Sequence, residues 1–223
     1  MDRSPWWLPH PLARAGRDLA RCLVPVECAG CGAFDERICD ECAAPWWEAP
    51  LRCEEDAPRL MVDNGALLPV WAIVPLTGEQ HEAVAAWKDG GRRDLDAFFA
   101  DAMGRQARTL GLDRVAVVPV PSRPGSVRRR GADLTGRLAT AAARAGGMPM
   151  VRALTVGRGE SRGASARQRW RSTQGAVQVR RSPAHDVILV DDVITTGATL
   201  AACVLALRER HVRVVGALVL ACA

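Results

Sequence analysis

The sequence predicts an α/β fold with a mostly parallel sheet flanked by helices, preceded by a small metal-binding segment. From about residue 67 onward, short Val-, Ile- and Leu-rich runs alternate with stretches of helical apolar spacing. The first 62 residues instead concentrate Cys, Pro, Trp and acidic side chains. A chain of 223 residues with 48% apolar residues is long enough for one core and an appendage. We therefore expect a cysteine-rich module and linker over residues 1–62 and an α/β domain over residues 63–223.

The first half of the α/β region has the pattern of a strand, two helices and a strand. Residues 68–76 are apolar and contain β-branched side chains, which favours a strand. Residues 79–88 and 94–110 carry apolar side chains at helical spacing. Residues 114–120 form a Val-rich run, the pattern of a strand that is buried on both faces.

The second half continues this alternation. A polar, Gly- and Arg-rich segment at 157–174 predicts a loop. Leu- and Ala-rich stretches predict helices, and the shorter Val- and Leu-rich runs predict strands. The expected helices are 134–145 and 200–209, and the expected strands are 151–156, 187–190 and 212–220.

The positive charge of the chain is concentrated in its middle third. The formal net charge is only +5, but residues 105–181 contain 17 Arg and 3 acidic residues. Residues 1–104 contain 10 basic and 18 acidic residues. This asymmetry favours an anionic ligand or partner at one place on the molecule.

Several classes of protein are excluded by simple sequence features. Lys88 is the only lysine and lies between Trp87 and Asp89, so no Walker A loop is present. No apolar run reaches the roughly 18 to 20 residues that cross a bilayer, so we expect no membrane insertion. The amino-terminal residues lack the pattern of a secretory signal. We therefore expect a cytoplasmic protein whose eight cysteines stay reduced.

Two C-x-x-C pairs lie close together near the start of the chain. They are Cys28 with Cys31 and Cys39 with Cys42, separated by seven residues. Four thiolates form a closed tetrahedral Zn²⁺ site, which is typical of a structural metal. A redox pair or an iron–sulfur centre is the alternative interpretation of this spacing. The Trp pairs at 6–7 and 46–47 are expected to pack rather than to stack on bases.

The most informative motif follows the predicted strand at 187–190. Two carboxylates, Asp191 and Asp192, come directly after four apolar residues, where a parallel sheet binds ligands. A loop of small residues then leads into a helix, and its N–H groups and hydroxyls can converge on one phosphate. The acids are suited to sugar hydroxyls or to a divalent cation. The loop residues are Thr195, Thr196, Gly197, Ala198 and Thr199.

This motif resembles the signature of the type I phosphoribosyltransferases: four apolar residues, two acids, two further residues and T-T-G-x-T. The resemblance implies that the loop binds the 5-phosphate of phosphoribosyl pyrophosphate (PRPP), with Mg²⁺, and that the acids bind the ribose hydroxyls. A strand–turn–helix with a Walker-B-like acid pair is the alternative, but its Walker A partner is missing.

Further segments resemble the ComF/GntX family, in which a zinc-binding segment precedes a phosphoribosyltransferase-like domain. Lys88 to Gly91 looks like its Lys-x-x-Gly segment, and 117–121 with 128–131 looks like its V-P-V-P and R-x-R-G pair. The resemblance makes Asp191, Asp192 and Lys88 candidate catalytic residues and adds Arg130 to the PRPP-binding set. The family's Phe-Asn-Gln after R-x-R-G is replaced by Ala-Asp-Leu at 132–134. This departure concerns the acceptor rather than the sugar phosphate.

Two basic features can be interpreted either as ligand-binding groups or as solvent-exposed charges. Five Arg between residues 158 and 171 form either a loop that closes over pyrophosphate or a solvated loop without a ligand. Lys88 is either exposed at a helix end or kept as a compact ammonium for a specific contact.

Two functions therefore compete. The first is a phosphoribosyltransferase (a pentosyl-transferring enzyme) that takes PRPP or another phosphorylated ribose and an acceptor. The second, implied by the association of the ComF family with competence, is a non-catalytic DNA-uptake accessory protein that binds single-stranded DNA. Against the second, Trp170 is the only aromatic residue in the basic region.

Overall fold

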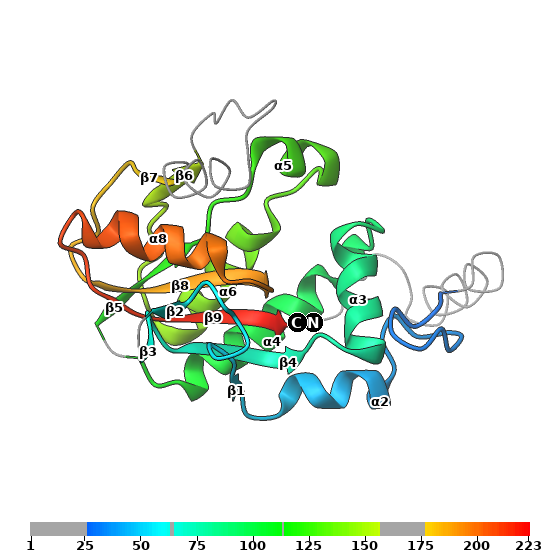
Figure 1. Cartoon of the computed structure of the whole chain (residues 1–223). Helices are drawn as coiled ribbons and strands as arrows, with labels where there is room; N and C mark the ends of the chain where they lie inside the picture. Colours follow the sequence, from blue (N-terminus) through cyan, green and yellow to red (C-terminus); the bar gives the residue numbers. More distant parts are fainter. Residues whose placement is uncertain (1–25, 63–64, 113, 157–176) are drawn as a thin grey trace.

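A central five-stranded sheet organises the molecule (Figure 1). The computed structural model describes residues 26–62, 65–112, 114–156 and 177–223. Within the sheet the strand order is β1-β4-β9-β8-β5. Four strands are parallel, and β1 (Leu51–Arg52) pairs antiparallel with β4 at one edge. The parallel strands are β4 (Val70–Pro75), β9 (Val214–Cys222), β8 (Asp186–Ile194) and β5 (Val115–Pro119). The predicted α/β class with a mostly parallel sheet is confirmed.

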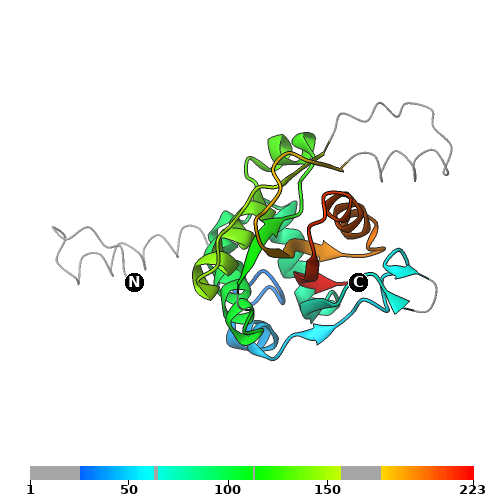
Figure 2. The same ribbon diagram turned by 90° about the vertical axis from the view of Figure 1, so that its left-hand side faces the viewer.

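Helices cover both faces of this sheet. One face packs against α4 (Asp96–Thr109) and α6 (Leu134–Gly146), and the other packs against α8 (Ala198–Arg208). Figure 2 shows α8 on the opposite side of the sheet from these helices. Along β8 the buried residues alternate, with Ile188 and Val190 in the first core and Val187 and Leu189 in the second. This double burial explains the uninterrupted apolar run in the sequence.

Shorter elements complete the described part of the chain. α3 (Gly78–Lys88) precedes α4 and is separated from it by the 3-10 helix η2 (Arg93–Leu95). A second 3-10 helix, η1 (Ala44–Trp47), follows α2 (Asp40–Ala43). Two small antiparallel pairs lie outside the main sheet. They are β2 (Met61–Val62) with β3 (Gly65–Ala66), and β6 (Leu154–Val156) with β7 (Val177–Val179).

Three differences between the observed and the predicted elements concern the surroundings of the sheet's carboxyl end. β8 continues beyond residue 190 to Ile194, because Asp191, Val193 and Ile194 still pair with β9 after β5 has ended. The strand predicted at 151–156 is limited to Leu154–Val156 and pairs with β7 instead of joining the main sheet. A short helix, α5 (Pro124–Arg130), was not predicted. Among the described residues no helix is both long and apolar enough to cross a membrane.

Candidate functional site

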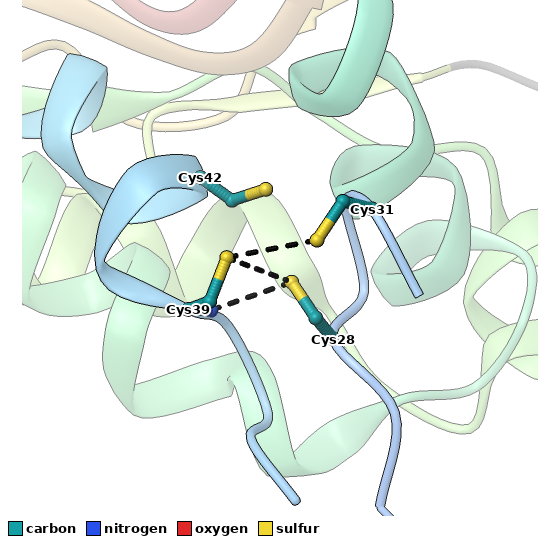
Figure 3. A group of neighbouring side chains, drawn as sticks. All are labelled: Cys28, Cys31, Cys39 and Cys42. Atoms are coloured by element: carbon teal, nitrogen blue, oxygen red, sulfur yellow. Dashed lines mark hydrogen bonds between the residues drawn. The ribbon is translucent and has the colours of Figure 1, made fainter. Parts of the chain in front are cut away.

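The four cysteines predicted to bind metal form one cluster (Figure 3). Cys28 and Cys31 lie at a tight turn, while Cys39 directly precedes α2 and Cys42 lies within it. Their four sulfur atoms all lie within 4.8 Å of one another. The Cys39 sulfur is 3.7 Å from that of Cys28 and 3.6 Å from that of Cys31. Four Zn–S bonds of about 2.3 Å in a tetrahedron would separate the sulfurs by about 3.8 Å, so the cluster fits a structural metal site such as zinc.

Backbone N–H groups stabilise negative charge on one sulfur of this cluster. Burial raises the pKa of the Cys28 thiol, but N–H groups of Cys31, Cys39 and Gly30 stabilise its thiolate and lower the pKa to about 6. The Cys39 N–H lies 3.3 Å from the Cys28 sulfur. Burial and the neighbouring thiols raise the pKa of Cys42. The backbone N–H groups thus favour the thiolate form of Cys28, which is the form that binds a metal ion.

The cysteine module is packed against the α/β core by aromatic side chains. Trp46 is fully buried, and its ring makes edge contacts with Phe98 and Phe99 of α4 at centroid distances of 5.8 and 5.0 Å. Trp47 makes a similar contact with Phe98 at 5.4 Å. The expectation that this Trp pair packs is confirmed.

The acid pair lies in the last part of β8, beyond the residues that pair with β5. Asp192 is nearly buried, and its Oδ2 lies 2.9 Å from Nζ of Lys88 at the end of α3. Its Oδ1 accepts a hydrogen bond of 2.7 Å from the N–H of Val193. Both partners of the ion pair are well shielded, with 18% of the Lys88 side chain and 12% of the Asp192 side chain exposed. Two residues that the sequence singled out separately therefore form one contact.

Asp191 has a different environment on the other side of the same strand. Its Oδ1 accepts a 2.8 Å hydrogen bond from the N–H of Asp192. Burial, together with the charge of Asp192, raises the pKa of Asp191 well above its ordinary value of 3.8. Its charge also acts on the Cys203 thiol of α8, whose pKa is raised mainly by burial. The two acids are thus chemically distinct, one ion-paired and one inclined to hold a proton.

The predicted phosphate loop joins β8 to α8. Gly197 is the N-cap residue of α8 and has a φ of +74°, a conformation that favours glycine. A Cβ at this position would lie 2.7 Å from Cγ of Leu60 and 3.1 Å from Cβ of Ala57. The N–H of Arg59 donates to the Thr196 carbonyl at 2.9 Å. The segment before β2 therefore backs the loop and fixes its shape at the amino end of an 11-residue helix.

A basic cavity adjoins Lys88. It has a volume of about 500 Å³ and is lined by Lys88, Asp89, Gly91, Arg129 and Arg130. Arg130 is 17% exposed at its side chain and lies 3.3 Å from Asp89, while Arg129 lies 3.6 Å from the same carboxylate. Three cations and one anion thus line a space beside the acid pair, which suits a multiply charged anion.

A second cavity of about 320 Å³ lies at the carboxyl end of β5. Its walls are mainly Pro and Val side chains of residues 119–127, and its polar groups come from Ser122, Asp133, Arg152, Thr155 and Arg180. Asp133 caps α6 by accepting from the N–H of Gly136 at 3.0 Å and binds Arg152 at 2.6 Å. This cavity mixes apolar walls with charged groups, as ligand sites commonly do.

The structure brings some predicted residues together and leaves others apart. Lys88 contacts Asp192 and shares a cavity with Arg130, whereas the four-cysteine cluster forms a separate centre. The Arg-rich segment at 158–171 lies outside the described residues. Sequence reasoning quoted Asp89 only as part of a segment, and it left Arg129, within the segment 128–131, outside the PRPP-binding set. The adjacency of Asp89 to the only lysine was the available signal.

No protein-family model matches the chain, and no curated protein is significantly similar to it. The assignment to the ComF/GntX family therefore stays a prediction that rests on the motifs quoted above.

Proposed function

We propose that the protein binds PRPP at the carboxyl end of β8 and transfers its phosphoribosyl group to an acceptor. One observation carries the proposal: the ammonium of Lys88, which lines a cavity with Arg129 and Arg130, lies 2.9 Å from Asp192, and Asp192 is followed in the chain by the glycine loop at the amino end of α8. This contact would connect acceptors for hydroxyls, donors for a phosphate and cations for a diphosphate.

Each part of PRPP has a counterpart in this arrangement. The 5-phosphate would bind the N–H groups and hydroxyls of the loop at 195–199, where the positive end of the α8 dipole adds to the attraction. Asp191 and Asp192 would accept hydrogen bonds from the ribose hydroxyls. The diphosphate would enter the basic cavity beside Lys88 and Arg130. Mg²⁺ would arrive on the diphosphate and neutralise part of its charge.

The residues also suggest how transfer would proceed. The bond between C1 of the ribose and the diphosphate oxygen breaks, the diphosphate leaves with the bonding electrons, and the acceptor supplies the electron pair for the new bond to C1. Lys88 and Arg130 would stabilise the charge that develops on the leaving group. The paired acids would hold the ribose while positive charge develops at C1.

Calorimetric titration with PRPP and Mg²⁺ tests the binding step. We expect the wild-type protein to bind, and Asp191→Asn and Gly197→Ala to lose at least tenfold in affinity. Asp186→Asn is the matched control, because Asp186 begins β8 and pairs with the exposed Arg213 away from the site. Absence of PRPP binding by folded wild-type protein would refute the proposal.

A parallel titration with single-stranded DNA separates the competing function. Binding to DNA without binding to PRPP, with an affinity that falls steeply as salt rises, would favour the accessory role. A panel of nitrogenous bases, titrated in the presence of PRPP, then identifies the class of acceptor.

A further inference from the structure

The cysteine module contacts the first turn of α3, the helix that carries Lys88, and the segment that follows this helix. At the beginning of α3, a Cβ on Gly30 would lie 3.1 Å from the Cβ of Glu79. Four residues beyond Lys88, NH1 of Arg92 donates a 3.1 Å hydrogen bond to the carbonyl oxygen of Glu27, the residue before Cys28. The turn that holds the first two cysteines therefore rests on the same helix as the candidate ligand-binding lysine.

Arg92 joins this turn to the segment that follows Lys88. Its guanidinium also binds Asp94 through Nε at 2.9 Å and NH2 at 2.9 Å, which fixes the plane of the fork. Its backbone N–H donates to the carbonyl oxygen of Ala86 at 3.1 Å, so the chain folds back on the last turn of α3. One residue thus connects the cysteine turn, the 3-10 helix η2 and the end of α3.

The turn between Lys88 and Arg92 is joined to the last turn of α3 by backbone hydrogen bonds. A Cβ at Gly90 would lie 2.7 Å from the carbonyl oxygen of Ala86, and Gly91 has a φ of +72°. The N–H groups of Asp89 and Gly90 both donate to the carbonyl oxygen of Ala85, at 2.9 and 3.0 Å. Because these backbone hydrogen bonds join Arg92 and the turn to the last turn of α3, a displacement of Arg92 acts on the segment that carries Lys88.

We propose that the four-cysteine metal centre holds Lys88 on Asp192, with Arg92 as the positioning residue between them. Loss of the metal releases the turn at Glu27, Arg92 loses its carbonyl partner, and the Lys88 ammonium separates from Asp192. The metal would then control the site at the end of β8 without contacting its ligand. Only the effect on PRPP affinity rests on the proposed function.

The composition of the chain supplies a direct readout of this link. Lys88 is the only lysine, so an amine-selective acylating reagent reports on this one side chain once the peptide that contains it is separated by mass spectrometry. In the wild-type protein the amine is largely shielded and ion-paired, so it should react slowly. Asp192→Asn removes the partner and sets the rate for a released lysine.

Arg92→Gln is the decisive variant because it leaves all four cysteines in place. We expect it to keep one zinc per chain and to acylate several-fold faster than the wild-type protein, approaching the rate of Asp192→Asn. Metal-free protein, prepared with a chelator, should behave in the same way if it stays folded. Arg213→Gln is the matched control, since Arg213 also pairs with one exposed carboxylate but at the start of β8, and it should match the wild-type rate.

Wild-type acylation rates in zinc-loaded Arg92→Gln would overturn the proposal, whatever the chelated protein does. A second measurement separates positioning from general loosening. If PRPP binds, Arg92→Gln should weaken it in the wild-type background but not in a Lys88→Met background. An equal loss in both backgrounds would also overturn the proposal. Failure of wild-type protein to bind PRPP would refute the proposed function and leave the lysine experiment valid.

Discussion

The four-cysteine centre and the acid-pair site are both clusters of polar groups, but they are built in opposite ways. The cysteine ligands come from two neighbouring turns, and their sulfurs lie within 4.8 Å of one another. The acid-pair site takes Lys88 from α3, Arg130 from α5, Asp192 from β8 and Gly197 from the start of α8. The first is defined by local chain geometry, and the second exists only once the whole sheet has formed. A substitution in the acid-pair site should therefore leave the four-cysteine centre intact.

Cys42→Ser is expected to have the largest effect and to act on the cysteine centre. Removing one of four thiolates opens the tetrahedral site, and structural zinc contributes an apparent binding free energy of about 10 to 16 kcal/mol in small zinc peptides. We expect the zinc content, measured by atomic emission, to fall from one per chain to near zero, and the melting temperature to fall with it. Ala43→Ser, at the next position of α2, is the control and should keep its zinc. Stoichiometric zinc in Cys42→Ser would contradict a four-cysteine site.

Gly197→Ala should act on the other centre and leave the metal in place. A left-handed conformation costs a residue with a Cβ about 1 to 2 kcal/mol, and the clash with Leu60 adds to this. We expect a loss of about 2 to 4 kcal/mol in the free energy of unfolding by urea, with unchanged zinc content. The control is Gly125→Ala, where nothing lies within 4 Å of the added Cβ. Equal stabilities of the two variants would show that the loop is not held as described.

Gly30→Ala tests the contact between the two regions. The new Cβ would lie 2.8 Å from the Cys42 sulfur and 3.1 Å from Cβ of Glu79, so either the cysteine turn or α3 must move. We expect a destabilisation of about 1 to 3 kcal/mol by overpacking and a faster transfer of zinc to a competing chelator. Gly125→Ala again provides the comparison. An unchanged rate of zinc transfer would mean that the turn tolerates this displacement.

Asp191→Asn should give the smallest change in stability, and it should stabilise the protein, whereas the three preceding variants destabilise it. Because the folded protein raises the pKa of Asp191, the wild-type protein loses stability as pH rises above the ordinary value of 3.8 and through the folded pKa. Asn carries no proton to lose, so the variant should be the more stable protein at neutral pH, by about 1 kcal/mol or roughly 2 to 4 °C in melting temperature. The advantage should disappear near pH 3.

Thermal melts across this pH range, with Asp186→Asn as the control, check the sign. A stability difference that does not change with pH would show that titration of Asp191 is not its cause. If Asp191→Asn also binds PRPP more weakly, the site has retained an acid at the expense of stability.

The sequence was most informative where structure is decided locally. The cysteine spacing predicts the cluster because each C-x-x-C pair closes its own turn, and the Val-rich runs predict strands because both faces are buried. The helix α5 was missed because none of its residues is buried, so its Arg-rich sequence shows no apolar periodicity. The last four residues of β8 were missed because their pairing partner, β9, follows later in the chain.

The candidate site shows the same limit. The loop at 195–199 and the acid pair are contiguous and were identified from their motif. The contact between Lys88 and Asp192 joins residues that are about 100 positions apart, so it depends on the path of the intervening chain. The sequence singled out both residues, but only the fold shows that they meet.

The position of β9 has a consequence for how the protein is made. This strand lies between β4 and β8, so without it the sheet separates into two halves. Its partner β4 precedes it by about 150 residues, and contacts between such distant segments form slowly. During synthesis, the edges of β4 and β8 that later pair with β9 stay exposed until β9 has left the ribosome. Chaperone demand and aggregation of the nascent chain should therefore depend on residues 214–222 more than on the earlier strands.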